Sequence, residues 1–434
     1  MSPTTIGLIG FAALFVLLAL RMPIGIAMTL TGIVGIAHLN NLDAALGILG
    51  SFFYSYSSVY TLSVIPLFVL MGNFAAVSGM GTDLYRAAYA WVGHRRGGLA
   101  SATIIACAGF AALSGSSVAS AVTMGKVSLP EMRRYNYDAR LATGAVAAGG
   151  TLGILIPPST VLIVYGLLTE QSIGRLFLAG FLPGILLALL FVATVAVVGF
   201  LQPHFGPPGE VRNLSVKIAE LGRAGPLLGI VVIVIGGIYL GVFAITEAAG
   251  IGCFLTMLYA IWRRALSFKS LATGLLETVR TTAMVFLILI GAHFFAPFLA
   301  MTRIPADLTG MLVQLAIPPV MVLVLILGAY IALGMFLEGF AMMVLTLPVV
   351  FPIVSTLGYD PIWFGIIMVI VLEMGLISPP VGINVFVVKG VAEDVPMGKI
   401  FAGILPFWLA MAVCVALLIA FPSIALVVPN TMMQ

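Results

Sequence analysis

Two proline pairs stand inside apolar stretches of the chain: Pro157-Pro158 within residues 153–160, and Pro379-Pro380 within residues 375–382. Proline removes a backbone donor and clashes with the preceding helical turn, so each pair predicts a broken helix. In hydrocarbon surroundings such a break is tolerated only in the protein interior or beside a cavity. Its carbonyl end suits a weakly held cation such as sodium, and its amide end attracts a carboxylate. Proline at the first position of the second half-helix would fit this geometry.

The two pairs belong to a longer repeat. The second follows the first by 222 positions (157 to 379), and residues 179–183 match residues 402–406 at a spacing of 223 (179 to 402). A single insertion reconciles the two spacings. The chain is therefore predicted to consist of two duplicated halves.

Each proline pair has a second group of candidate ligands elsewhere in its half. Ser114, Ser116 and Ser117 are expected to face residues 153–159, and residues 334–338 are expected to face residues 375–384. Glycine and serine also simply let membrane helices pack closely, which is the alternative interpretation. The recurrence of this pairing in both halves favours a site.

Two polar residues of the second half stand out for their apolar surroundings. The Glu338 carboxylate is costly there unless it meets water, a cation or a substrate, although capping the tip is an alternative role. Asn384 could donate to a substrate or satisfy the broken backbone.

Composition defines the elements that must position these residues. Of the 434 residues, 62% are hydrophobic and 8% are charged, and the mean hydropathy is +1.22, which predicts an integral membrane protein. The first apolar run lacks a charged leader and a cleavage site before Arg21, so it is expected to be a span. Cys107, Cys253 and Cys414 are isolated thiols with an expected packing role.

The first half, residues 1–201, is predicted to contain a scaffold followed by a transport core. The scaffold, residues 1–98, has short spans near 4–20 and 23–38, a long segment near 51–80 and a basic stretch around Arg86, Arg95 and Arg96. The core, residues 99–201, begins with a re-entrant helical hairpin at 99–129 whose tip carries the serines. A broken helix near 138–170 and a span near 176–201 complete it.

A polar connection at residues 202–223 is predicted to be a cytoplasmic linker, and residues 224–434 repeat the plan. The second scaffold, residues 224–305, has spans near 225–241 and 243–262 and a long helix near 271–301. The second core, residues 306–434, has a hairpin near 318–356, a broken helix near 361–392 and a span near 400–428.

The distribution of positive charge predicts the orientation. With the N-terminus outside, every Lys and Arg except Arg175 and Arg303 lies in an inner loop, Arg280 among them. Arg133, Arg134, Arg263 and Arg264 are then topology anchors. The two halves become inverted repeats with antiparallel broken helices, the pattern of a secondary transporter with its site near the midplane.

The four motifs together resemble the large membrane subunit of tripartite ATP-independent periplasmic (TRAP) transporters, the DctM type, over essentially the whole chain. They are Ser114-Gly115-Ser116-Ser117, Gly153-x-x-Ile156-Pro157-Pro158-Ser159, Gly334-Met335-Phe336-Leu337-Glu338 and Gly375-x-x-Ser378-Pro379-Pro380-x-Gly382.

The resemblance implies an all-α, polytopic, inverted-repeat elevator transporter with two re-entrant hairpins and two broken helices. It would reside in a bacterial inner membrane with both termini in the periplasm. Driven by sodium, it would import an organic acid delivered by a periplasmic binding protein, with a separate small four-helix membrane subunit as partner. No cofactor beyond the coupling sodium ions is implied, and the acid, a dicarboxylate or a sialic acid among others, stays open.

The resemblance also implies which residues of this chain form the binding sites, because the motif positions match those of the family. One sodium site would use Ser114, Ser116, Gly153, Ile156 and Pro158, largely through backbone carbonyls, and the second would use Gly334, Gly375, Ser378 and Val381. The substrate should lie near Glu338, with Ser117, Ser159 and Asn384 as further candidate contacts.

Three other classes of protein fit the sequence less well. A stand-alone sodium/dicarboxylate symporter of the divalent-anion family would carry Ser-Asn-Thr at both tips, and neither 114–117 nor 334–339 contains it. A membrane-embedded enzyme would need a nucleophile with a base, or a metal cluster, whereas the sequence has four scattered His and no paired carboxylates. A channel fits paired breaks around a closed site less well than alternating access does.

Overall fold

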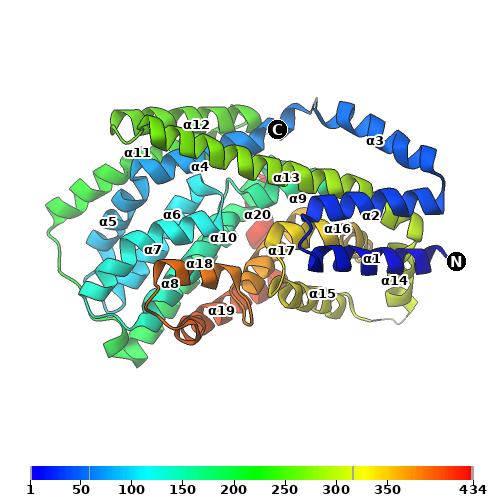
Figure 1. The fold of residues 1–434 in the computed structure, drawn as a ribbon. Helices are drawn as coiled ribbons and strands as arrows, with labels where there is room; N and C mark the ends of the chain where they lie inside the picture. The colour runs from blue at the N-terminus through cyan, green and yellow to red at the C-terminus, as the bar shows by residue number, and fades with distance from the viewer. Residues whose placement is uncertain (1, 58, 315–316, 432–434) are drawn as a thin grey trace.

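The computed structural model describes residues 2–57, 59–314 and 317–431, and the regular structure within these ranges is helical (Figure 1). In the first half the helices are α1 (Pro3–Ala19), α2 (Ile24–Leu39), α3 (Leu42–Ser57), α4 (Val64–Ser78), α5 (Met80–Val92), α6 (Gly98–Ser114), α7 (Ser117–Arg134), α8 (Ala139–Leu155), α9 (Thr160–Thr169) and α10 (Ile173–Leu201). Short 3-10 turns lie at Tyr60–Ser63 and Pro203–Phe205.

The second half repeats much of this order. Its helices are α11 (Leu214–Tyr239), α12 (Ile245–Trp262), α13 (Phe268–Thr302), α14 (Ile304–Gln314), α15 (Pro319–Gly334), α16 (Gly339–Thr356), α17 (Pro361–Leu376), α18 (Ile383–Val391), α19 (Met397–Ala420) and α20 (Ser423–Asn430). Within the described ranges, eight segments are long and apolar enough to cross a membrane. The prediction of a multi-span helical membrane protein is confirmed.

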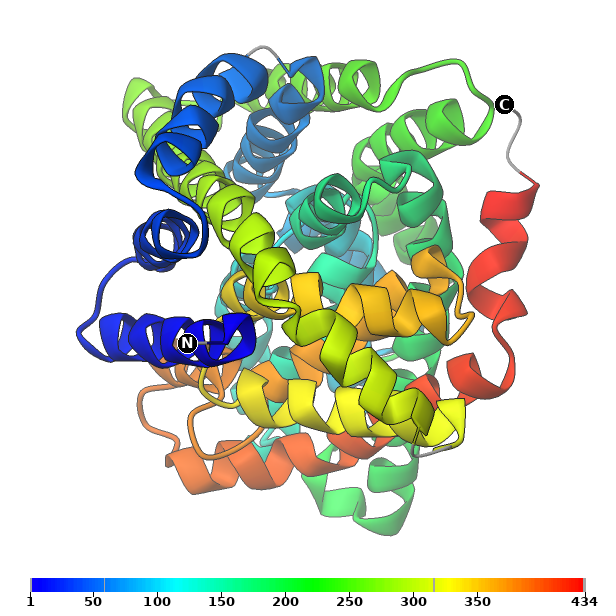
Figure 2. The same ribbon diagram turned by 90° about the vertical axis from the view of Figure 1, so that its right-hand side faces the viewer.

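The helices form two groups that meet where α13 packs on α16 and where α4 and α5 pack on α6. On one side α13 packs against α1, α2 and α4, and α12 packs against α4 and α11. On the other side α8 packs against α6, α7 and α19, and α17 packs against α15 and α10. Figure 1 shows α12, α4 and α13 along the top and α7, α8 and α19 below, and Figure 2 shows α13 crossing diagonally in front of the helices around α16 and α17.

The deepest core surrounds the broken helices. Residues 141–166, which include most of α8 and α9, are all buried, and so are residues 362–378 of α17 and the start of its loop. A helix that is apolar on every side must be enclosed by others. The first proline-interrupted segment and the helix α17 before the second break therefore occupy the centre of the molecule, whereas Pro379 and Pro380 themselves are exposed.

The segment predicted as one long element near 51–80 is divided, which corrects the sequence analysis. A separate helix, α3, begins at Leu42, and α4 begins only at Val64. Two local features explain the late start of α4. Pro66 in its first turn cannot donate to a preceding carbonyl, and the Ser63 hydroxyl bonds the Tyr60 carbonyl at 2.6 Å, competing with helix formation.

Other boundaries also differ from prediction. The connection predicted at 202–223 is non-helical or 3-10 only over 202–213, because α11 begins at Leu214 and runs on into the next span. The last span, predicted near 400–428, is two helices that meet at Pro422. The helices α5 and α14 were not predicted.

Candidate functional site

The first proline pair interrupts its helix as predicted. Helix α8 ends at Leu155, Ile156 is extended with ψ of 122°, and α9 begins at Thr160. In a continuous helix, residues 157 and 158 would donate to the carbonyls of Gly153 and Ile154, and proline supplies no such donor. These two carbonyls are therefore available to other partners.

The prolines lie in the link between the half-helices, not at the first position of the second one, which corrects that prediction. Ser159 precedes α9 and its hydroxyl accepts the Leu162 amide at 3.3 Å. Serine caps a helix in this way and proline has no side chain to do so. In the second half Gly382, with φ of +64°, precedes α18.

The tip of the first hairpin packs directly on the first break. The Thr160 hydroxyl donates to the Gly115 carbonyl at 3.0 Å, and Ser114 and Ser120 share a hydroxyl hydrogen bond of 2.8 Å. A Cβ atom on Gly153 would lie 2.4 Å from the Ser116 carbonyl oxygen. No side chain fits between these backbones, so the Ser116 carbonyl of the tip lies directly against the backbone of the broken helix.

The second half has the same arrangement with different details. Helix α17 ends at Leu376, and a Cβ atom on Gly375 would lie 2.7 Å from the Gly334 Cα atom of the second hairpin tip. The Ser378 hydroxyl donates to the Met374 carbonyl at 2.6 Å and accepts from the Trp408 indole at 3.0 Å. Val381 is partly exposed on the loop to α18.

A cavity of about 590 Å³ opens between the two hairpin tips. The first hairpin contributes Ser114, Ser116 and Ser117, and the second contributes Glu338 and Phe340. Its walls also include residues of the first break, of α17, of α4 and of α13, namely Ile154, Thr160, Val161, Glu373, Leu376, Val69, Gly72, Asn73, Ala76, Glu277, Arg280, Thr281 and Met284. Such a volume accommodates a small organic molecule.

Glu373 and Asn384 form a buried polar pair at the edge of this cavity. Their residues are 1% and 0% exposed, and the Asn384 amide donates to the Glu373 carboxylate at 3.0 Å. One oxygen of each side chain, Glu373 Oε1 and Asn384 Oδ1, has no hydrogen-bond partner. Buried oxygens without a donor favour the approach of a cation or a donor group.

Some of the predicted site residues line the cavity, and the others lie outside its lining. Ser114, Ser116, Ser117 and Glu338 line the cavity, and the Glu338 carboxylate also caps α16 by accepting the Ala341 amide at 3.4 Å. Outside the lining lie Gly153, Ile156, Pro158, Ser159, Gly334, Gly375, Ser378, Val381 and Asn384. Their assignment as sodium or substrate ligands stays a prediction.

Several cavity residues were missed or misplaced. Arg280, predicted in an inner loop, lies inside α13 and faces the cavity with Glu277. Asn73 of α4 donates to the Thr278 hydroxyl of α13 at 2.9 Å. Asn73 also lines the cavity, together with Glu277 and Arg280. The interruption of an apolar run by Glu277 and Arg280, three positions apart on one helix face, was the available signal.

Two helix breaks, and a cavity enclosed by both hairpin tips and the first break, inside a multi-span helical protein are the features of a membrane transporter. Comparison with known structures agrees on the fold. The crystal structure of the Alcanivorax borkumensis YdaH transporter covers 88% of this chain and 90% of its own, with a TM-score of 0.63 and 15% identity. At that identity the likeness concerns the fold alone.

Sequence comparison identifies the family. The model for the tripartite ATP-independent periplasmic transporter, DctM component, matches residues 11–424. The Pseudomonas aeruginosa C4-dicarboxylate TRAP transporter large permease protein DctM is 37% identical, covering 87% of this chain and 88% of its own. The Vibrio cholerae sialic acid large permease SiaM is 32% identical over 86% of each chain, and the Oleidesulfovibrio alaskensis isethionate permease DctMQ is 33% identical over 89% of this chain and 60% of its own.

The chain belongs to the DctM family of TRAP transporter large permeases. It is thus a multi-pass transporter component of a bacterial membrane and not an enzyme, as predicted from the resemblance.

Proposed function

We propose that this chain is the large permease of a sodium-coupled importer of an organic acid. The observation that carries the proposal is the 590 Å³ cavity, which both hairpin tips, the first helix break and α13 enclose together. A substrate there would touch elements of both halves at once. Its binding would therefore depend on how the halves are arranged.

The cargo is proposed to be a small carboxylate. Arg280 in the cavity wall supplies a guanidinium that can pair with a carboxylate in two-point contact. Hydroxyls from Ser116 and Ser117 offer neutral donors beside it. Relatives are named for C4-dicarboxylates, sialic acid and isethionate, which all carry an acidic group.

The coupling ions are proposed to bind behind the cavity wall. At the first site, the Gly153 backbone lies against the Ser116 carbonyl, with no room for a side chain between them. At the second, Gly334 and Gly375 are in backbone contact. Sodium bridging carbonyls of a tip and a break would order both, so that the adjoining substrate surface forms only when the ion is present.

Transport is proposed to proceed by an elevator motion of inverted repeats. The core would consist of α6–α10 and α15–α20, and the scaffold of α1–α5 and α11–α13. Packing supports a core built from both halves, because α8 lies against α19 and α10 lies against α17. In the proposed orientation both termini lie in the periplasm and the loops rich in Lys and Arg lie in the cytoplasm.

Two partners complete the proposed system. A periplasmic binding protein would deliver the acid, and a small four-helix subunit would pack on the scaffold within the inner membrane. The DctMQ relative, of which this chain covers 60%, is consistent with a fused second component. The divalent-anion symporter considered from the sequence is set aside, because the chain belongs to a different family.

Uptake into proteoliposomes tests the proposal. The chain would be reconstituted with its small subunit, and radiolabelled succinate, isethionate and N-acetylneuraminate would each be supplied on a matching binding protein. An inward sodium gradient should raise accumulation of one of them several-fold over a choline gradient. Equal accumulation under both gradients would refute sodium coupling.

A further inference from the structure

A second polar cavity, of about 490 Å³, lies away from the transport cavity and shares no lining residue with it. Its walls are α5, the end of α7, the connection before α11 and the first turns of α11. It therefore joins the first hairpin to helices of the proposed scaffold. The proposed transport function gives it no role.

Donor groups without partners line this cavity. The hydroxyl of Tyr85, a residue only 3% exposed, has no hydrogen-bond partner. Arg86 and Arg134 also line the cavity, and neither is among the arginines that form the ion pairs of the described chain. A buried hydroxyl and two free guanidinium groups together call for an anionic oxygen acceptor.

Acceptor groups without partners line it as well. Glu131 is partly buried and outside those ion pairs. Glu220 uses one carboxylate oxygen to pair with Arg223 at 2.7 Å, while its other oxygen is buried and unbonded. Glu210, by contrast, is neutralised by Arg212 at 2.9 Å. The free carboxylate oxygens call for a cationic donor.

A zwitterion with a phosphate and an amine would supply partners for both the free donors and the free acceptors of this cavity. Phosphate matches the geometry of arginine donors, and an ammonium suits carboxylates beside aromatic faces such as those of Tyr89 and Tyr135. The first turns of α11 and the connection before it also expose apolar side chains. Val211 is 77% exposed and Leu214 is 64% exposed, so acyl chains have a surface to lie on.

The surroundings are those of a membrane interface. The Lys217 ammonium lies 5.6 Å from the ring centroid of Trp91, which is 44% exposed. Amphipathic aromatic and basic side chains of this kind gather at the level of lipid headgroups. We propose that this cavity binds the headgroup of an amine-bearing phospholipid of the phosphatidylethanolamine type.

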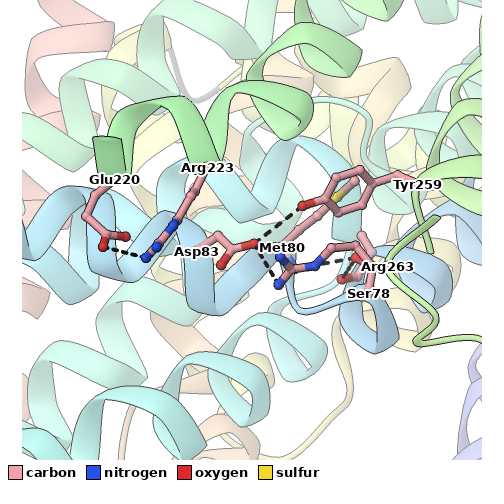
Figure 3. Close-up of polar contacts among 8 residues, drawn as sticks. Ser78, Met80, Asp83, Glu220, Arg223, Tyr259 and Arg263 are labelled. Carbon is pink, nitrogen blue, oxygen red and sulfur yellow. Dashed lines mark hydrogen bonds and ion pairs between the residues drawn. The ribbon is translucent and has the colours of Figure 1, made fainter. Parts of the chain in front are cut away.

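Polar contacts with α12 and the residue that follows it hold α5, one wall of this cavity, in place (Figure 3). Asp83, which is 3% exposed, pairs with Arg263 at 3.2 Å and accepts from the Tyr259 hydroxyl at 3.4 Å. Arg263, predicted as a topology anchor only, thus ties α12 to α5. Figure 3 also shows the Glu220–Arg223 pair on α11 close to this network. The cavity is accordingly preformed on its scaffold side.

Native mass spectrometry of the full chain in detergent tests the proposal. The probes are dioleoyl phosphatidylethanolamine and dioleoyl phosphatidylglycerol at equal concentrations. The wild type should retain the ethanolamine lipid in preference to the glycerol lipid. The double variant Arg86→Gln/Arg134→Gln should lose about tenfold in retention of both, because charge-assisted hydrogen bonds to phosphate are removed.

Two further variants separate the parts of the site. Glu131→Gln should reduce the preference while phosphatidylglycerol retention persists, because one of the two carboxylates available to the amine is lost and the phosphate partners are kept. Tyr85→Phe, which removes one hydroxyl at constant shape, should weaken retention of both lipids about threefold to tenfold. The matched control is Arg95→Gln/Arg96→Gln, two exposed arginines next to α5 but outside the cavity.

Soluble phosphoethanolamine distinguishes the sources of the headgroup. Competition only at a large excess over the lipid supports a membrane ligand, and competition at equal concentration supports a free phosphoamine at the same site. Equal retention of both lipids by the wild type, or the same loss in the Arg95/Arg96 control as in the cavity variant, would overturn the proposal. The readout is lipid binding, so failure of sodium-coupled uptake would leave it unaffected.

Discussion

At the scale of single residues, the site depends on glycines that let two backbones touch. A Cβ atom on Gly153 would come within 2.4 Å of the Ser116 carbonyl oxygen, and one on Gly375 within 2.7 Å of the Gly334 Cα atom. Real contacts of this kind are not made at such distances, so the tip would have to move away. Carbonyl ligands for an ion would move with it.

Replacing Gly153 by alanine should therefore weaken sodium binding while α8 itself, for which alanine is the better helix former, remains intact. Overpacking of this kind costs about 1–3 kcal/mol, which corresponds to a loss of about fivefold to 150-fold in apparent sodium affinity. The measurement is the sodium dependence of uptake in proteoliposomes. Gly250→Ala on α12 is the matched control, since nothing lies within 4 Å of its added Cβ atom. Unchanged sodium affinity in Gly153→Ala would argue against an ion at this contact.

At the scale of elements, each proline pair leaves carbonyls of the preceding helical turn without the amide donors that a continuous helix would provide. Gly153 and Ile154 lose their donors at the first break. At the second break the Gly375 carbonyl instead accepts a hydrogen bond from the Ser378 amide at 3.0 Å. The two breaks are thus alike in position but not in the oxygens that they leave free.

Restoring the donors should remove the proposed first sodium site. In the double variant Pro157→Ala/Pro158→Ala, new amides can bond the Gly153 and Ile154 carbonyls and extend α8. Sodium should then no longer raise the Tm of the detergent-purified protein. Pro226→Ala within α11 is a control of the same chemistry outside the proposed core. Persistence of the full sodium-dependent rise in Tm would show that these carbonyls do not hold the ion.

At the scale of the whole molecule, the two halves are interlocked, not side by side. Helix α8 of the first half packs on α19 of the second, and the Tyr165 hydroxyl of α9 donates to the Pro361 carbonyl at the start of α17 at 2.6 Å. The proposed core is therefore one body made from both halves. Its contacts with the proposed scaffold include that of α13 with α16.

Fixing that contact should stop transport. Ala300 of α13 and Thr356 of α16 line a common cavity of about 840 Å³, so cysteines at both positions can be joined by a bifunctional thiol reagent. The test uses a background in which Cys107, Cys253 and Cys414 are replaced by alanine. Cross-linking should abolish uptake, whereas each single-cysteine variant should keep it after the same treatment. Full uptake by the cross-linked protein would contradict an elevator motion across this contact.

Much of the helical plan was predictable because it follows from local chemistry. Proline pairs break helices wherever they occur, and the predicted broken helix at 138–170 agrees with α8 and α9, which span residues 139–169. The hairpin predicted at 318–356 likewise agrees with α15 and α16. The shorter amphipathic helix α5 was missed, because the cluster of Arg86, Arg95 and Arg96 was interpreted only as a loop anchor.

The sequence by itself determined the membrane class and the two break points, because hydropathy and the missing proline amides act over a few neighbouring residues. Only the tertiary structure decided which side chains share a cavity. Arg280 and Asn73 face the hairpin tips because α13 and α4 pack beside them, and Ser159 is occupied as a helix cap. Contacts between residues hundreds of positions apart depend on the packing of whole helices, which no local pattern along the chain specifies.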